Sequence, residues 1–128
     1  MNANPVFSLH IPTRILFGCG EIKKLATEKL PGKKALIVIS AGGSMKKYGY
    51  LDKVIGFLKE NDVESVVFDK VLPNPIKQHV MEAAQLCRDE HCDFVIGLGG
   101  GSSIDSAKSI ANGFNAKDVV MNVPGINP

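Results

Sequence analysis

The sequence lacks the long apolar runs, the leader and the basic clusters that mark membrane, secreted and nucleic-acid-binding proteins. Its apolar runs, such as residues 35–39, are far shorter than the ~20 residues of a membrane-spanning helix. The first ten residues do not join a basic stretch to an apolar one, as a secretory leader would. The formal net charge is only +2, without a lysine or arginine cluster. We therefore expect a cytoplasmic protein with neither a membrane nor a nucleic acid as partner.

Cysteine is scarce, with three residues in the chain. An odd number cannot all pair within one chain, which fits a reducing compartment. Cys87, His91 and Cys92 stand close together and invite a metal interpretation. Structural zinc normally takes four ligands from two such groups, and the sequence holds no second group. We therefore predict no metal site here, but a helix end that carries a buried cysteine.

Charge and apolar content are ordinary, which excludes disordered and collagen-like classes. Hydrophobic residues make up 45% of the chain and charged residues 22%. At 128 residues the chain is long enough for one domain with its own core and too short for two ordinary domains.

Strand-like and helix-like segments alternate along the chain. Apolar or β-branched runs predict strands at residues 35–39, 63–68 and 93–98, and the first of these is continuous, as in a strand covered on both faces. Residues 21–29 predict a short helix. Later helices are indicated by apolar side chains at helical spacing: Leu51, Val54, Ile55 and Leu58, then Val80, Ala83, Ala84 and Cys87, then Ile104, Ala107 and Ala111.

This alternation predicts an α/β fold, a doubly wound, Rossmann-like parallel sheet with helices on both faces. Extended strands are expected before it, within residues 6–17. Residues 112–128 lose the periodicity and are expected to form a loop that leads elsewhere.

Three glycines, Gly99, Gly100 and Gly101, follow the last predicted strand and open a helix. Without Cβ atoms this turn permits positive φ and lets a ligand approach the backbone, while the helix start offers N–H groups to a phosphate. Ser102 is expected to cap the helix, and Asp105 to complete a capping box. A tight strand-to-helix connection without a ligand is the alternative. The Asp105 carboxylate would repel phosphate, so a capping role suits it better.

A second loop at the same expected edge of the sheet contains Ser40, Gly42, Gly43 and Ser44, followed by two lysines. Ligands of open α/β sheets bind beyond the carboxyl ends of the strands, where this loop lies. Its hydroxyls and lysines could meet the adenosine end of a nucleotide. The alternative is a flexible loop with solvated lysines.

Catalytic candidates are few. The three histidines are scattered, and none has a partner at a spacing that signals a catalytic triad. His79 is expected at the surface. We predict no catalytic residue and no metal ligand within the chain.

Three segments resemble the iron-containing, metal-dependent alcohol dehydrogenases, which share their architecture with glycerol dehydrogenase and dehydroquinate synthase. Residues 12–20 are similar to the opening strand and glycine turn of that family. Pro73-Asn74-Pro75 is similar to its Pro-Asn-Pro loop, and residues 99–108 to its Gly-Gly-Gly-Ser-x-x-Asp-x-Ala-Lys signature.

The resemblance implies roles for several residues. Gly99, Gly100, Gly101 and Ser102 would hold the pyrophosphate of a nicotinamide cofactor, and Asn74 would lie near the cofactor cleft. Members that prefer NAD often carry an acidic residue where this chain has Ser40, so NADP is the expected cofactor, with NAD as the alternative. The residues implied at the cofactor are Ser40, Gly42, Gly43, Ser44, Asn74, Gly99, Gly100, Gly101, Ser102 and Asp105.

The implied activity is hydride transfer between an alcohol or aldehyde and NAD(P). In the family a helical second domain supplies an Asp and several His to Fe2+ or Zn2+. We expect residues 1–128 to be a single NAD(P)-binding domain without it, inactive alone. Alternatives are a stand-alone, non-catalytic dinucleotide-binding module and a relative of glycerol dehydrogenase or dehydroquinate synthase. A homo-oligomer stays open.

Overall fold

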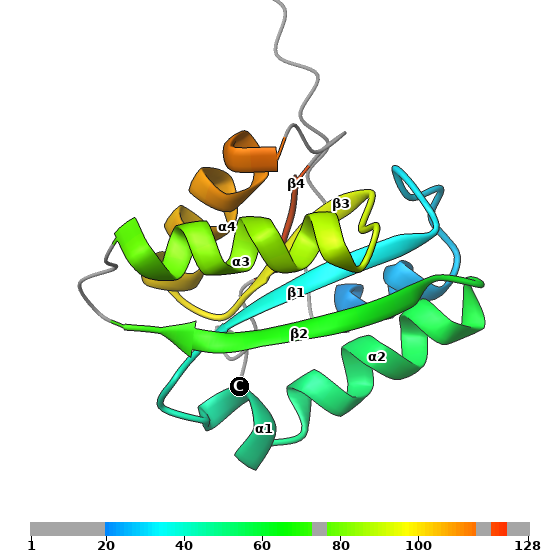
Figure 1. The fold of residues 1–128 in the computed structure, drawn as a ribbon. Helices are drawn as coiled ribbons and strands as arrows, with labels where there is room; N and C mark the ends of the chain where they lie inside the picture. The colour runs from blue at the N-terminus through cyan, green and yellow to red at the C-terminus, as the bar shows by residue number, and fades with distance from the viewer. Residues whose placement is uncertain (1–19, 73–76, 115–118, 123–128) are drawn as a thin grey trace, which may run out of the picture.

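Four strands form one parallel sheet at the centre of the fold (Figure 1). The computed structural model describes residues 20–72, 77–114 and 119–122. The strands are β1 (Lys34–Ser40), β2 (Glu64–Val71), β3 (Phe94–Leu98) and β4 (Val119–Asn122), in the spatial order β2-β1-β3-β4. The predicted α/β parallel sheet is therefore confirmed.

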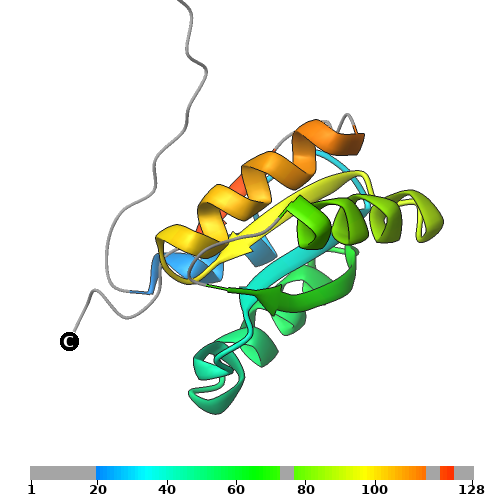
Figure 2. The ribbon, with the colours of Figure 1, turned by 60° about the vertical axis from the view of Figure 1, so that its left-hand side comes forward.

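Helices cover both faces of this sheet, as Figure 2 shows from the side. The 3₁₀ helix η1 (Glu21–Ala26) and α2 (Tyr50–Glu60) lie on one face, and α3 (Lys77–Asp89) and α4 (Gly101–Phe114) on the other. A single helical turn, α1 (Ser44–Lys47), follows β1. No helix within the described ranges is long and apolar enough to cross a membrane.

Alternate side chains of β1 point to opposite faces of the sheet. Because helices cover both faces, residues 35–39 of the strand are all apolar. Ala35, Ile37 and Ile39 join one core cluster, whereas Leu36 and Val38 join the other. The first cluster includes Leu51, Val54 and Leu58 of α2, and the second includes Ala83, Cys87, Ala107 and Ile110 of α3 and α4.

Some predictions were wrong in detail. The segment expected as a loop after residue 112 contains β4, which pairs with β3 from Val95↔Val119 to Leu98↔Asn122. Four residues are too few to show a strand period, and the open edge of β3 determines their conformation. Helix η1 is a 3₁₀ helix that ends at Ala26, and α1 lies in a segment expected as a loop. Residues 6–17 lie outside the described part of the chain.

The end of α3 agrees with the prediction of a helix end that buries a cysteine. Cys87 is fully buried in the last turn of α3. His91 adopts the left-handed conformation, with φ 57°. The Cys92 N–H donates to the Cys87 carbonyl at 2.9 Å and the His91 N–H to the Arg88 carbonyl at 3.3 Å. These bonds form a Schellman motif, which satisfies the last carbonyls of the helix.

Gly97 lets α4 pack closely against β3. A Cβ at this position would lie 3.0 Å from the Cβ of Ala107 and 3.3 Å from the Cα of Ile104. The second of these is a backbone atom and cannot rotate away. The missing side chain therefore fixes how near α4 can come to the sheet.

We predict that Gly97→Ala destabilises the fold by about 1–3 kcal/mol, because the added methyl overpacks this contact. Urea unfolding measures the loss. Gly56→Ala in α2 is the matched control, since a Cβ there meets no atom within 4 Å. The control should keep or raise stability, by up to about 1 kcal/mol, through helix propensity. Equal stability of Gly97→Ala and the parent would show that α4 is free to move outward.

Candidate functional site

The strand order reverses between β1 and β3, because β2 lies beyond β1 and β4 lies beyond β3. In open parallel sheets such a reversal leaves a crevice at the carboxyl ends of the strands, where ligands bind. Ser40 ends β1 and Leu98 ends β3, so the two predicted loops both leave the sheet at this point.

An open hollow of about 240 Å³ lies at this edge. It is lined by Ser40, Ala41, Gly42, Val71, Leu72 and Ser102. The Ala41 N–H donates to the Val71 carbonyl at 2.7 Å and joins the ends of β1 and β2 beneath it. The fold thus brings together three predicted site residues, Ser40, Gly42 and Ser102, from segments about sixty residues apart. Their role toward a cofactor stays a prediction.

In the glycine turn, one residue has a backbone conformation that favours glycine, and the other two have open space where a side chain would be. Gly99 has φ +125°, and a Cβ there would lie 3.3 Å from Ser103 Oγ and 3.8 Å from Met45 Cγ. The turn therefore lies against α1. At Gly100 and Gly101 a Cβ would meet no described atom within 4 Å. The backbone of these two residues is open to close approach.

Helix α4 begins directly at this open backbone. The Ile104 N–H donates to the Gly100 carbonyl at 3.2 Å, which makes Gly100 the N-cap and Gly101 the first helical residue. The first turn of a helix directs N–H groups and the positive end of the helix dipole at the space before it. This arrangement can accept a phosphate beside the hollow.

The predicted capping box is wrong. Ser102 is the second residue of α4 rather than its N-cap, because Gly100 already occupies that place. Asp105 consequently lies in the second turn, exposed, and is not at the third helical position that a capping box requires. The glycine run lets the helix begin two residues earlier than the Ser-x-x-Asp spacing suggested.

The loop after β1 turns through Gly43, whose φ of +78° precedes α1. Ser44 is the first residue of that helix and is exposed. The Lys46 ammonium donates to Asp69 Oδ2 at 2.5 Å, and this hydrogen bond is the main cause that holds the pKa of the Asp69 carboxyl below its ordinary value. Lys46 is therefore paired, although both side chains are about half exposed.

Asp69 was expected in a loop at the carboxyl end of its strand, without a role or a partner. It belongs to β2, which extends to Val71 and so carries Asp69 toward α1. Only the pairing of β2 with β1 shows that this carboxylate reaches Lys46, since 23 residues separate the two in sequence.

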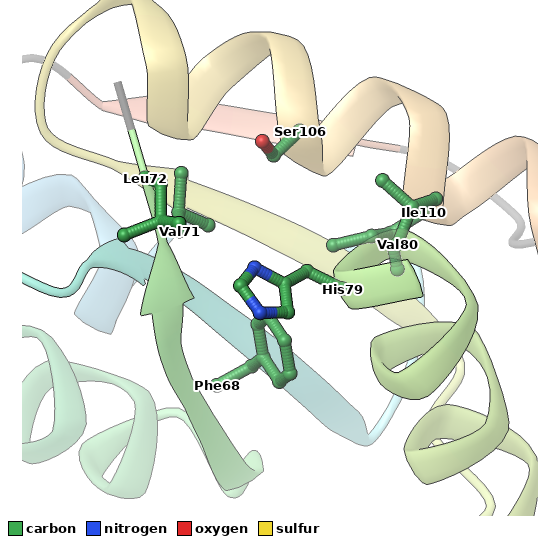
Figure 3. Close-up of a pocket in the computed structure, with 7 residues that line it drawn as sticks. All are labelled: Phe68, Val71, Leu72, His79, Val80, Ser106 and Ile110. Carbon is green, nitrogen blue, oxygen red and sulfur yellow. The ribbon is translucent and has the colours of Figure 1, made fainter. Parts of the chain in front are cut away.

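A second, much smaller cavity of about 10 Å³ lies between β2, α3 and α4 (Figure 3). Figure 3 shows the His79 ring directed from α3 toward β2, with Ser106 facing the same space from α4. His79 Nδ1 and Ser106 Oγ are buried and have no hydrogen-bond partner among the described residues. The expectation of a surface histidine was wrong in this respect. The space fits one water molecule at most and is too small for a substrate.

Metal ligands do not gather in the described ranges. No three His, Cys, Asp or Glu side chains there stand close enough to hold a metal ion. Asn74 and the rest of the Pro-Asn-Pro loop lie outside the described residues, so its predicted place at the cofactor stays a prediction.

The sequence profile of the iron-containing alcohol dehydrogenases matches residues 12–127. The chain is 42% identical over 100 residues to an NADPH-dependent butanol dehydrogenase of Clostridium saccharobutylicum, covering 78% of this chain and 25% of that protein. It is 42% identical over 109 residues to the NADPH-dependent aldehyde reductase YqhD of Escherichia coli, covering 85% and 27%.

The same similarity holds in three dimensions. The crystal structure of the NADH-dependent butanol dehydrogenase A of Thermotoga maritima superposes with a TM-score of 0.76 at 41% identity, covering 84% of this chain and 27% of that one. The chain thus spans about a quarter of the length of these relatives. The profile match covers far more than half of the 128 residues, so the chain belongs to the iron-containing alcohol dehydrogenase family.

Proposed function

We propose that residues 1–128 form the nicotinamide-dinucleotide-binding domain of an enzyme that transfers hydride between an alcohol or aldehyde and NAD(P). One observation carries this proposal: Ser40, Gly42 and Ser102 line one hollow at the strand reversal, next to the open backbone of Gly100 and Gly101. The named activities of the relatives, butanol dehydrogenase and aldehyde reductase, support the substrate class.

The cofactor would cross the edge of the sheet in a defined direction. The pyrophosphate would lie against Gly100, Gly101 and the first turn of α4, where N–H groups meet its charge. The adenosine ribose would lie toward Ser40 and the loop before α1. A bound nicotinamide supplies the hydride acceptor, and this domain orients it.

The metal that the family name implies does not fit the described residues, which hold no group of three ligands. We therefore derive no step through Fe2+ or Zn2+ from this chain. Its ligands are proposed to lie outside residues 1–128, in the three quarters of the relatives' length that the chain does not span.

The first test is a bulky substitution in the glycine turn. Gly100→Val should weaken binding of NADP at least about tenfold, because its side chain would occupy the space proposed for the pyrophosphate. Its Cβ meets no described atom, so the fold should persist. Calorimetric titration of the folded proteins measures the dissociation constants.

Gly56→Val is the matched control, since its Cβ also meets open space but on α2, away from the site. It should bind NADP like the parent. If the parent and folded Gly100→Val bind NADP with equal affinity, the pyrophosphate does not lie against this turn. Absence of any binding by the parent, to NADP and NAD alike, would overturn the proposed function.

Cofactor choice is proposed to favour NADP. Ser40 places no carboxylate where the ribose would lie, and a 2′-phosphate would meet the hydroxyls of Ser40 and Ser44 and the charge of Lys46. The ion pair between Lys46 and Asp69 works against this preference, because the carboxylate neutralises the ammonium and would itself repel a phosphate. We expect an NADP preference of about tenfold, which corresponds to ~1.4 kcal/mol.

The Asp69 carboxylate gives this proposal a direct test. Asp69→Asn should tighten NADP binding by roughly threefold to tenfold and leave the affinity for NAD unchanged. A larger change is not expected, because exposed ion pairs contribute little free energy. Both dissociation constants need the same ionic strength, because salt screens the phosphate contact.

Glu82→Gln provides the matched control. Glu82 lies on α3, and its Oε2 is 3.5 Å from Lys70 Nζ, so this substitution also removes the carboxylate of a lysine ion pair. It should alter neither constant. An Asp69→Asn variant with the parent's affinities for both cofactors would show that Lys46 does not contact the 2′ position.

A further inference from the structure

Two thiols lie near the amino ends of the strands, at the opposite end of the sheet from the proposed cofactor site. Cys87 is in the last turn of α3, and Cys92 lies two residues before β3, at the amino ends of the strands. Both pack in the core cluster beneath α3 and α4, Cys87 fully buried and Cys92 partly exposed. Neither forms a disulfide in the structure.

The backbone brings these two side chains together. Of the two hydrogen bonds of the Schellman motif, the one that spans more residues joins Cys87 and Cys92, with 2.9 Å between the Cys92 nitrogen and the Cys87 oxygen. Side chains at these two positions commonly touch. With standard backbone dimensions, this bond limits the Cα–Cα distance to about 6.8 Å, the upper end of the range that disulfides span.

Helix α2 ends in the same motif, so the side chains at the equivalent two positions can be compared. Asp62 has φ 57°, and the Val63 N–H donates to the Leu58 carbonyl at 2.8 Å. Leu58 and Val63 are both buried in the core cluster on the other face of the sheet. An apolar pair therefore suffices at the end of α2, so this motif does not in itself call for thiols.

The thiols differ in reactivity. Interaction with the Cys87 thiol, and then with the nearby Lys34 ammonium, lowers the pKa of Cys92, although burial and the carboxylates of Glu90 and Asp93 oppose this. The interaction with Cys92, together with burial, raises the pKa of Cys87. Cys92 is the partly exposed sulfur and Cys87 the fully buried one, so Cys92 is the thiol that a disulfide in solution can reach. Thiolates are the nucleophiles in disulfide exchange, and the direction of the Cys92 pKa agrees with that role.

We propose that Cys87 and Cys92 are a redox-active dithiol that low-molecular-weight disulfides, such as oxidised glutathione, convert into an intramolecular disulfide. The Cys92 thiolate attacks one sulfur of oxidised glutathione, and one glutathione leaves. Cys87 then gives up its proton and attacks the Cys92 sulfur, which releases the second glutathione. The protein loses two electrons and two protons, and one oxidised glutathione becomes two reduced molecules. This site is independent of the cofactor.

The test uses the full chain with Cys19→Ser, which removes the third cysteine. After incubation of the native protein with oxidised glutathione and an acid quench, intact mass should fall by two hydrogen atoms. Thiols counted after unfolding should fall from two to none, and peptide mapping should join Cys87 to Cys92. This measurement needs no variant at the two cysteines.

Two further variants, which copy the leucine and valine at the end of α2, identify the roles of the sulfurs. In the Cys19→Ser background, Cys87→Leu should accumulate one glutathione on Cys92, because no second thiol resolves the mixed disulfide. Cys92→Val should take up none, because Cys87 is fully buried. A stable glutathione adduct on the Cys19→Ser protein itself, or two thiols that stay reduced, would overturn the proposal. If folded Cys92→Val takes up glutathione as fast as Cys87→Leu does, the assignment of Cys92 as the attacking sulfur is overturned.

Discussion

The place of α4 on the sheet depends on the close contact between its backbone and β3 at Gly97. Since a Cβ there would meet the Cα of Ile104, glycine sets the distance between the two elements. With the helix held this near, its first turn begins at the edge of the sheet, three residues after Leu98. The open backbone of Gly100 and Gly101, and the approach of Ser102 to Ser40, both follow from that position. A small change at one buried atom would therefore alter the whole proposed phosphate site.

The two edges of the sheet carry different chemistry. At the carboxyl ends of the strands, Ser40, Gly42 and Ser102 line an open hollow together with apolar side chains, and Lys46 of α1 is paired with Asp69 of β2. At the amino edge, an ordinary helix-ending motif has thiols where α2 has leucine and valine. The first arrangement suits an anionic ligand held by main-chain donors, and the second suits thiol exchange.

Much of the fold could be predicted because its signals are local. The unbroken apolar run of β1 and the helical spacing in α2 each reflect burial against an immediate neighbour. The glycine turn could also be predicted, since three adjacent glycines after a strand have few other uses. By contrast, β4 takes its conformation from the edge of β3, and the ion pair of Lys46 depends on how far β2 extends. The burial of His79 Nδ1 likewise comes from packing between α3 and β2, which no spacing along the chain records. The start of α4 was misplaced because a capping box and a glycine N-cap compete within a few residues.

The central claim is that a dinucleotide binds at the strand reversal, with its phosphates on the main chain before α4. Amide chemical-shift mapping of the ¹⁵N-labelled chain during titration with NADP tests it most directly, because each N–H reports on itself without a substitution. We predict that the largest shifts fall on residues 99–103, with a second group at residues 40–44. Largest shifts instead at the cavity beside His79, or at the amino edge near Cys92, would contradict it.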